Sequence, residues 1–195
     1  MARMRDENKR AAILQSGKKL FSERGFFNTS VSDIVKDSGL PVGTIYTYFK
    51  NKEEIVQVIV DEGWAEFYGR LESTLANGGT MQERLAILLD VFIPELLQDM
   101  DLINILLTEA AAFTRIEEKL EKVNDLVGSI LASASAGNTA TATLSRRDMK
   151  SLLSVFFLGI LSSVRLSRIS SSGLDPEEIQ GAVRKVVQSS LGIHL

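Results

Sequence analysis

The residues whose types and spacing best suit a chemical task lie in the stretch GTIYTYFK, residues 43–50. Gly43 has no side chain, so another molecule can approach its backbone closely. Thr44 and Thr47 each offer a hydroxyl and a methyl group, which suit the base edges of DNA and the methyl group of thymine. Tyr48 adds a phenolic hydroxyl of the kind that contacts phosphate. Contact with a nucleic acid is the chemistry that these residues share.

Neighbouring residues extend the predicted contact surface on both sides. Lys52 carries a mobile positive charge that suits a phosphate group. Thr29 and Ser30 stand at a predicted helix start, where free backbone N–H groups form a second phosphate site. Pro41 and Val42 offer only apolar contact, which is best suited to a thymine methyl.

Tyr46 fits two interpretations, packing in the core or a ring edge at the DNA groove, and both stay open. Residues 42–49 contain no Arg, Asn or Gln for bidentate contacts with bases, so specificity has to rest on thymine methyl groups and DNA shape. The predicted DNA-binding residues are Thr29, Ser30, Pro41, Val42, Gly43, Thr44, Tyr46, Thr47, Tyr48 and Lys52.

Two short helices joined by a tight turn would hold these residues in place. Ser30 can cap the first helix, with Asp33 returning a bond to the cap. Gly39 suits a left-handed helix end, and Pro41 suits the start of the next helix. The second helix, Val42 to Phe49, would then enter the major groove, as in a helix-turn-helix.

Three sequence patterns in this region resemble the TetR family of transcriptional regulators. They are Phe21-x-x-x-Gly25-Phe26, Ser30-Val31-x-Asp33-Ile34-Val35 and Gly39-Leu40-x-x-Gly43-Thr44-Ile45-Tyr46-x-Tyr48-Phe49-x-x-Lys52-Glu53-Glu54. The resemblance implies a helix-turn-helix DNA-binding domain at residues 1–50 and a helical effector-binding and dimerisation domain at residues 51–195. It also implies a homodimer that binds a double-stranded operator.

Charge is distributed unevenly along the chain. Residues 1–52 carry ten Lys or Arg against five Asp or Glu, whereas the remainder carries 12 against 20. A basic segment joined to an acidic body suits a protein of which one end alone meets phosphates. Arg3 and Arg5 fit either a basic arm along the DNA or a solvated tail.

Composition excludes several classes of function. The chain has no cysteine, and its single histidine, His194, lies one residue from the C-terminus. We therefore predict no metal, no cofactor and no enzyme activity. With no signal peptide and no apolar run long enough to span a bilayer, we expect a cytoplasmic protein without a membrane partner.

Apolar periodicity predicts an all-α fold of about nine helices. Pro94 lies inside one of them and should kink it or end it early. Asn104 and Thr108 lie four residues apart on a nearly all-apolar helix, so they need partners from side chains or from a ligand. The small residues Ser133–Thr143 predict a mobile loop.

The residues after the helix-turn-helix are expected to bind a small apolar or aromatic effector and to pair two chains, although each residue set also fits a plain core. The candidate ligand-binding residues are Trp64, Tyr68, Phe92, Asn104, Thr108, Phe113 and Phe157. The candidate dimer-interface residues are Phe156, Gly159, Ile160, Ser163, Val164, Ala182, Val183, Val186 and Val187.

Together these features predict a dimeric, ligand-responsive transcriptional regulator, a repressor released from a palindromic operator when the effector binds. Two other classes stay open. One is a small-molecule carrier or enzyme with a vestigial DNA-binding end. The other is a nucleoid-type protein that binds DNA without specificity, which the ratio of specific to non-specific affinity at fixed salt would distinguish.

Overall fold

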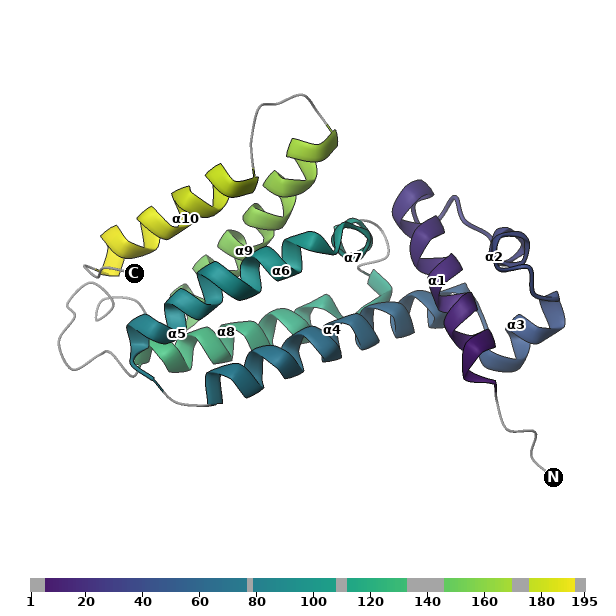
Figure 1. The fold of residues 1–195 in the computed structure, drawn as a ribbon, viewed down its shortest axis with the longest axis horizontal. Helices are drawn as coiled ribbons and strands as arrows, with labels where there is room; N and C mark the ends of the chain where they lie inside the picture. The colour runs from purple at the N-terminus through teal and green to yellow at the C-terminus, as the bar shows by residue number, and fades with distance from the viewer. Residues whose placement is uncertain (1–5, 77–78, 108–111, 133–145, 170–175, 192–195) are drawn as a thin grey trace. The chain divides into compact units, whose positions relative to one another are not determined.

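The computed structural model describes residues 6–76, 79–107, 112–132, 146–169 and 176–191 (Figure 1). Its helices are α1 Glu7–Arg24, α2 Val31–Ser38, α3 Val42–Tyr48, α4 Lys52–Ala76, α5 Met81–Ile87, the π-helix η1 Leu88–Phe92, α6 Ile93–Gln98, α7 Met100–Leu106, α8 Ile116–Ala132, α9 Arg146–Ile169 and α10 Pro176–Leu191. With α5, η1 and α6 taken as one continuous run, the described residues form nine helical segments and no strand. The all-α prediction is confirmed. Arg3, Arg5, Thr108, the predicted loop Ser133–Thr143 and His194 lie outside the described residues.

The chain forms two compact units. The first contains residues 1–66 and 100–116, and the second contains residues 67–99 and 117–195. The predicted DNA-binding domain, residues 1–50, lies within the first unit, which also takes in α7 and the first part of α4. None of the helices in the described residues has the length and apolar character that a membrane span needs.

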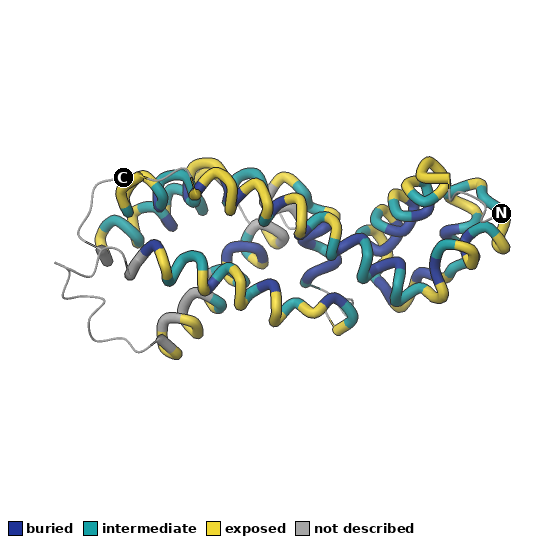
Figure 2. The backbone as a smooth tube through the Cα atoms, turned by 90° about the horizontal axis from the view of Figure 1, so that it is seen from below, coloured by how far each residue is buried: buried dark blue, intermediate teal, exposed yellow. Residues whose placement is uncertain are grey.

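A single apolar core holds the first unit together. Ile13, Leu20 and Phe21 of α1 are buried, as the three- and four-residue spacing of this helix predicts. They pack with Ile34 of α2 and Ile45 of α3. Figure 2 shows the buried residues on the inner sides of these helices and the exposed ones outside. Burial of one stripe per helix therefore fixes which side of α2 and α3 meets solvent.

The turn between α2 and α3 has the predicted local structure. Ser30 and Asp33 form a reciprocal capping box at the start of α2. Gly39 ends α2 with φ of +66°, in the left-handed region that favours glycine. Pro41 precedes α3, which ends at Tyr48 with Phe49 as its C-cap. Local rules thus account for the helix-turn-helix.

Pro94 neither ends nor interrupts its helix. The chain stays helical from α5 to α6 but widens just before the proline into the π-helix η1. There the N–H of Ile93 donates to the carbonyl of Leu88, five residues back. Of the two predicted outcomes, an early end and a kink, the early end is wrong, because a wider turn accommodates the missing N–H.

Gly17 allows close packing of α1 on α4, and this predicts a stability effect. A Cβ atom at Gly17 would lie 3.0 Å from Ile55 Cγ2 and 3.2 Å from Ile59 Cδ1, whereas at Gly69 it would meet nothing within 4 Å. We expect Gly17→Val to lower the free energy of unfolding by about 1–3 kcal/mol through overpacking. Urea denaturation followed by circular dichroism measures this, with Gly69→Val as the control. Equal stability of the two variants would contradict the expected close packing.

Candidate nucleic-acid interface and apolar cavity

One side of α3 is open to solvent. Val42, Gly43, Tyr46 and Thr47 are exposed, whereas Ile45 on the other side is buried. Tyr46 is 54% exposed, which favours the groove over the core for its ring. Thr47 donates its hydroxyl proton to the carbonyl of Gly43 at 2.8 Å. Its methyl group and oxygen lone pairs are therefore what it can present to a base.

The start of α2, which precedes α3 in the sequence, is a second exposed part of this candidate interface. The Asp33 carboxylate accepts from the Ser30 hydroxyl and from the Ser30 N–H, the latter at 2.9 Å. These two bonds, the hydroxyl bond first, lower the pKa of Asp33. The backbone at the start of this helix is thereby held in the geometry that anion binding requires.

Thr29 does not have the predicted exposed side chain. It is only 1% exposed, and its hydroxyl lies 2.9 Å from the carbonyl of Gly25 and 3.2 Å from that of Leu20. In this conformation the Thr29 side chain does not face solvent, and its predicted phosphate contact stays a prediction. A threonine directly before a cap can turn inward to satisfy the carbonyls at the end of the preceding helix, here α1.

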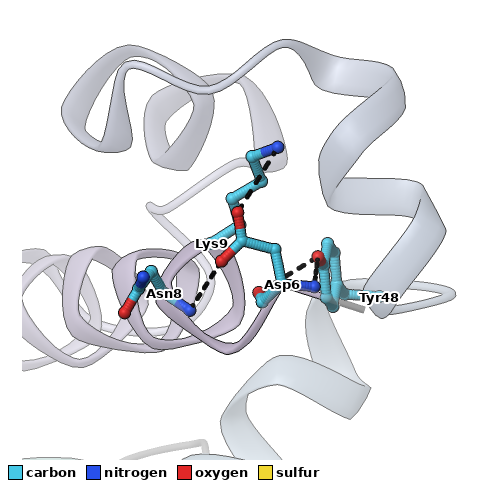
Figure 3. Close-up of polar contacts among 4 residues, drawn as sticks. All are labelled: Asp6, Asn8, Lys9 and Tyr48. Carbon is cyan, nitrogen blue, oxygen red and sulfur yellow. Dashed lines mark hydrogen bonds and ion pairs between the residues drawn. The ribbon is translucent and has the colours of Figure 1, made fainter. Parts of the chain in front are cut away.

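Tyr48 connects the end of α3 to the start of α1 (Figure 3). Its hydroxyl accepts from the N–H of Asp6 at 2.8 Å and donates to the Asp6 carbonyl at 3.1 Å. The Asp6 carboxylate in turn accepts from the N–H of Asn8 and lies 3.6 Å from the Lys9 ammonium. Since a phenol has one proton, a phosphate contact from Tyr48 requires that proton to leave the Asp6 carbonyl.

Lys52 lies against the loop between α1 and α2. Its Nζ donates to the carbonyls of Phe26 and Thr29, each at 2.7 Å, and lies 4.2 Å from the centre of the Phe26 ring. An ammonium group has three N–H donors, so one is left for a phosphate oxygen. Lys52 therefore fixes the residue that precedes the α2 cap, and its predicted phosphate contact stays a prediction.

An ion pair also joins α1 to α2. Lys19 Nζ lies 2.7 Å from Asp37 Oδ1. The hydrogen bond from Lys19, followed by one from Ser16, lowers the pKa of Asp37, and the bond to Asp37 raises the pKa of Lys19. Both partners of this pair are partly open to water, so it orients the helices more than it stabilises them.

The second unit contains an apolar cavity of about 140 Å³. Residues of α4, α5, η1, α6, α8, α9 and α10 line it, and every one is apolar. They are Phe67, Leu71, Leu85, Leu88, Leu89, Phe92, Ile93, Val123, Val127, Phe157, Ile160 and Val187. A cavity of this size and lining accommodates roughly six carbon atoms, as the benzene-binding cavity of similar volume does.

Of the predicted ligand-binding residues that the structure describes, two line the cavity, Phe92 and Phe157. Trp64 and Asn104 belong to the first unit, where the Asn104 amide donates to Ser22 Oγ at 3.2 Å. Phe113 also packs in the first unit, with its ring centre 4.7 Å from that of Phe26.

Tyr68 belongs to the second unit but not to the cavity lining, and the Lys122 ammonium lies 5.8 Å from its ring centre. Trp64, Tyr68, Asn104 and Phe113 thus do not line this cavity, and their predicted contact with a ligand stays a prediction. Within the described residues, Asn104 keeps one buried side-chain oxygen, Oδ1, without a hydrogen-bond partner.

Sequence reasoning missed most of the cavity because it favoured aromatic and polar side chains. The lining is made instead of ordinary aliphatic stripes, in which Leu85, Leu88 and Leu89 of one helical run face Val123 and Val127 of α8. The periodic spacing of these residues was the available signal. It identifies a buried face but not a gap within it.

Helices α9 and α10 present apolar residues to solvent as well as to the core. Val155, Gly159 and Leu166 are exposed at helical spacing on α9, and Ala182 and Val186 are exposed on α10. Val155 is 72%, Leu166 56% and Val186 53% exposed. Such a stripe on two adjacent helices is a candidate protein–protein surface.

Several predicted interface residues face inward instead. Ile160 and Val183 are buried within the unit, and Ile160 and Val187 line the cavity. None of these three belongs to the exposed stripe, since Ile160 and Val183 are buried and Val187 is half-buried, and their predicted interface role stays a prediction. Ser163 is half-buried, and the side chains of Phe156 and Val164 are not among those that the structure describes.

No group of three or more His, Cys, Asp or Glu side chains within the described residues is arranged to hold a metal ion.

The comparisons with known proteins agree with one another. Residues 13–59 match the family model described as "Bacterial regulatory proteins, tetR family". The "Fatty acid metabolism regulator protein" of Bacillus subtilis is 35% identical over 77 residues, which are 40% of this chain and 40% of that protein. The "HTH-type transcriptional repressor NemR" of Escherichia coli is 28% identical over 81 residues, 41% of each chain. The matched region thus spans about two fifths of the length of these curated relatives.

Among solved structures, the transcriptional regulator FadR from Bacillus subtilis in complex with stearoyl-CoA has a similar fold. Its TM-score is 0.73 at 23% identity, over 95% of this chain and all of that one. The helix-turn-helix geometry, the family model and these relatives agree that residues 13–59 form a DNA-binding domain of the TetR family of bacterial regulatory proteins.

Proposed function

We propose that this protein is a dimeric transcriptional repressor that leaves a palindromic DNA operator when a small apolar effector binds its second unit. The observation that carries the proposal is the solvent-exposed face of α3, with Val42, Gly43, Tyr46 and Thr47 on one side of a seven-residue helix. A helix of this length, held at both ends, suits insertion into a major groove.

The elements beside α3 suit phosphate contacts. The capped start of α2 presents Ser30 and free N–H groups, and Lys52 lies at the loop before it. Phosphate contacts fix the register of the protein on the duplex, while Thr44 and Thr47 carry the direct readout of bases. The net positive charge of residues 1–52 adds long-range attraction.

The cavity supports an effector with an alkyl or acyl chain. Its lining offers no hydrogen bond, so a polar ligand would lose its bonds to water without replacement. The regulator of similar fold from Bacillus subtilis was solved with stearoyl-CoA, which carries such a chain. A chain of more than about six carbons exceeds the volume described, so it has to extend beyond the cavity or move its walls apart.

Differential affinity is what would make such a ligand regulatory. An effector changes operator affinity only by binding the DNA-competent and DNA-incompetent states unequally. Helix α4 begins with Lys52 and later supplies Phe67 and Leu71 to the cavity. Wall movement on chain binding therefore acts on the same helix that carries a predicted phosphate contact.

The direct test mixes the purified protein with a fragment of DNA from upstream of its own gene. We expect a retarded complex in a gel shift that survives excess unrelated DNA, and its release by a saturated acyl chain but not by the matching polar headgroup alone. Equal competition by unrelated DNA would favour non-specific binding. Retention of the complex with every apolar compound would contradict the effector proposal.

Lys52→Ala should weaken operator binding at all sequences alike. Loss of one phosphate contact also lowers the slope of log affinity against log salt by about 1. Fluorescence anisotropy at several salt concentrations measures both quantities, and Lys185→Ala, an exposed lysine of α10, serves as the control. Weaker binding with an unchanged slope would assign Lys52 to holding the α1–α2 loop alone.

The dimer proposal rests on the exposed stripe of α9 and α10. Val155→Glu would place an unpaired charge inside the paired surface, which should raise the dimer dissociation constant about 100-fold or more. Sedimentation velocity over a range of concentrations measures this. Val91→Glu is the matched control, because Val91 is 51% exposed on η1. An undiminished dimer in Val155→Glu would place the interface elsewhere.

A further inference from the structure

The π-helix η1 forms a large part of the cavity wall. Leu88, Leu89 and Phe92 of η1 and Ile93 directly after it all line the cavity. A π turn fits one more residue into each turn than an α-helix does, so neighbouring side chains come to one face together. The shape of the cavity therefore depends on whether this turn is maintained.

The backbone of η1 leaves one carbonyl in need of a donor. In an α-helix the N–H of Ile93 would donate to Leu89, but here it donates to Leu88. In a continued π-helix the donor to Leu89 would be residue 94, which is a proline and has no N–H. The Leu89 carbonyl thus has no helical partner of either kind.

Gln180 supplies the missing donor. Its side-chain Nε2 lies 3.0 Å from the Leu89 carbonyl, in a partly buried setting. One helical turn further along α10, Arg184 Nη1 lies 2.8 Å from the carboxylate of Asp90, the next residue of η1. Both partners of that ion pair are about a third exposed, so it contributes less than the bond from Gln180.

We infer that Gln180 is a positioning residue that holds the π turn in place and thereby sets which chain lengths the cavity accepts. This inference rests on the proposed role of the cavity as an effector site. Without the Gln180 donor, a buried carbonyl would lack a partner and the turn would open to water or rearrange. Leu89 and Phe92 would then no longer form a fixed wall, and chains of different length would be discriminated less.

The test uses the full-length protein with Gln180→Glu, which keeps the shape of the side chain but replaces the donor by a carboxylate oxygen. Gln82→Glu, the same substitution at an exposed position of α5, is the matched control. The first readout is hydrogen exchange of the amides of residues 88–93 in the ligand-free protein. We expect exchange about tenfold faster in Gln180→Glu than in the wild type or the control.

The second readout is the affinity for saturated fatty acids of increasing chain length, measured by calorimetry. We expect the wild type and Gln82→Glu to prefer one length, and the ratio between the best chain and one four carbons longer to fall at least about fivefold in Gln180→Glu.

Unchanged exchange in residues 88–93 would overturn the positioning role, whatever the protein binds. Faster exchange with an unchanged length profile would overturn the link to selectivity. A wild type that binds no chain of any length would instead remove the proposed effector site, and the claim of selectivity with it.

Discussion

The ammonium of Lys52 lies between two carbonyls and the ring of Phe26, and the arrangement of the loop before α2 depends on this contact. The Thr29 carbonyl, one of the two acceptors, directly precedes the Ser30 cap, so Lys52 holds the backbone just before α2 begins. A partly buried ammonium is costly unless several acceptors surround it. The loop must therefore keep the conformation that offers both carbonyls, and Tyr48 fixes the other end of the motif at Asp6.

Much of the helix-turn-helix could be predicted from the sequence because its determinants are local. A capping box, a left-handed glycine and a proline at a helix start each affect only the backbone within about four residues. Each of the three is found as expected. The inward turn of Thr29 and the carbonyl contacts of Lys52 could not be predicted in this way. They depend on which carbonyls the end of α1 leaves open, and that is decided by packing around Phe26.

The cavity was less predictable because it is a property of several helices at once. Each apolar stripe was visible, yet a stripe indicates burial alone, and a gap appears only where α4, the α5–α6 run, α8, α9 and α10 fail to fill the space between them. Polar residues were a poor guide for the same reason. The amide of Asn104 needed a partner, as expected, and Ser22 of α1, 82 residues earlier, accepts from it, which no pattern in the sequence indicates.

Pro94 shows where local and long-range determinants meet. Its missing N–H follows from the sequence, and so does the expectation of a disturbed helix. Whether the helix ends or widens depends on a hydrogen-bond donor for the Leu89 carbonyl, which has no partner within the helix. That donor is the side chain of Gln180, 91 residues later in the chain. Because α10 both supplies this bond and presents Val186 to solvent, the cavity wall and the predicted pairing surface share one rigid helix. A change in the shape of the cavity wall that moves α10 therefore also moves the surface where two chains are proposed to meet.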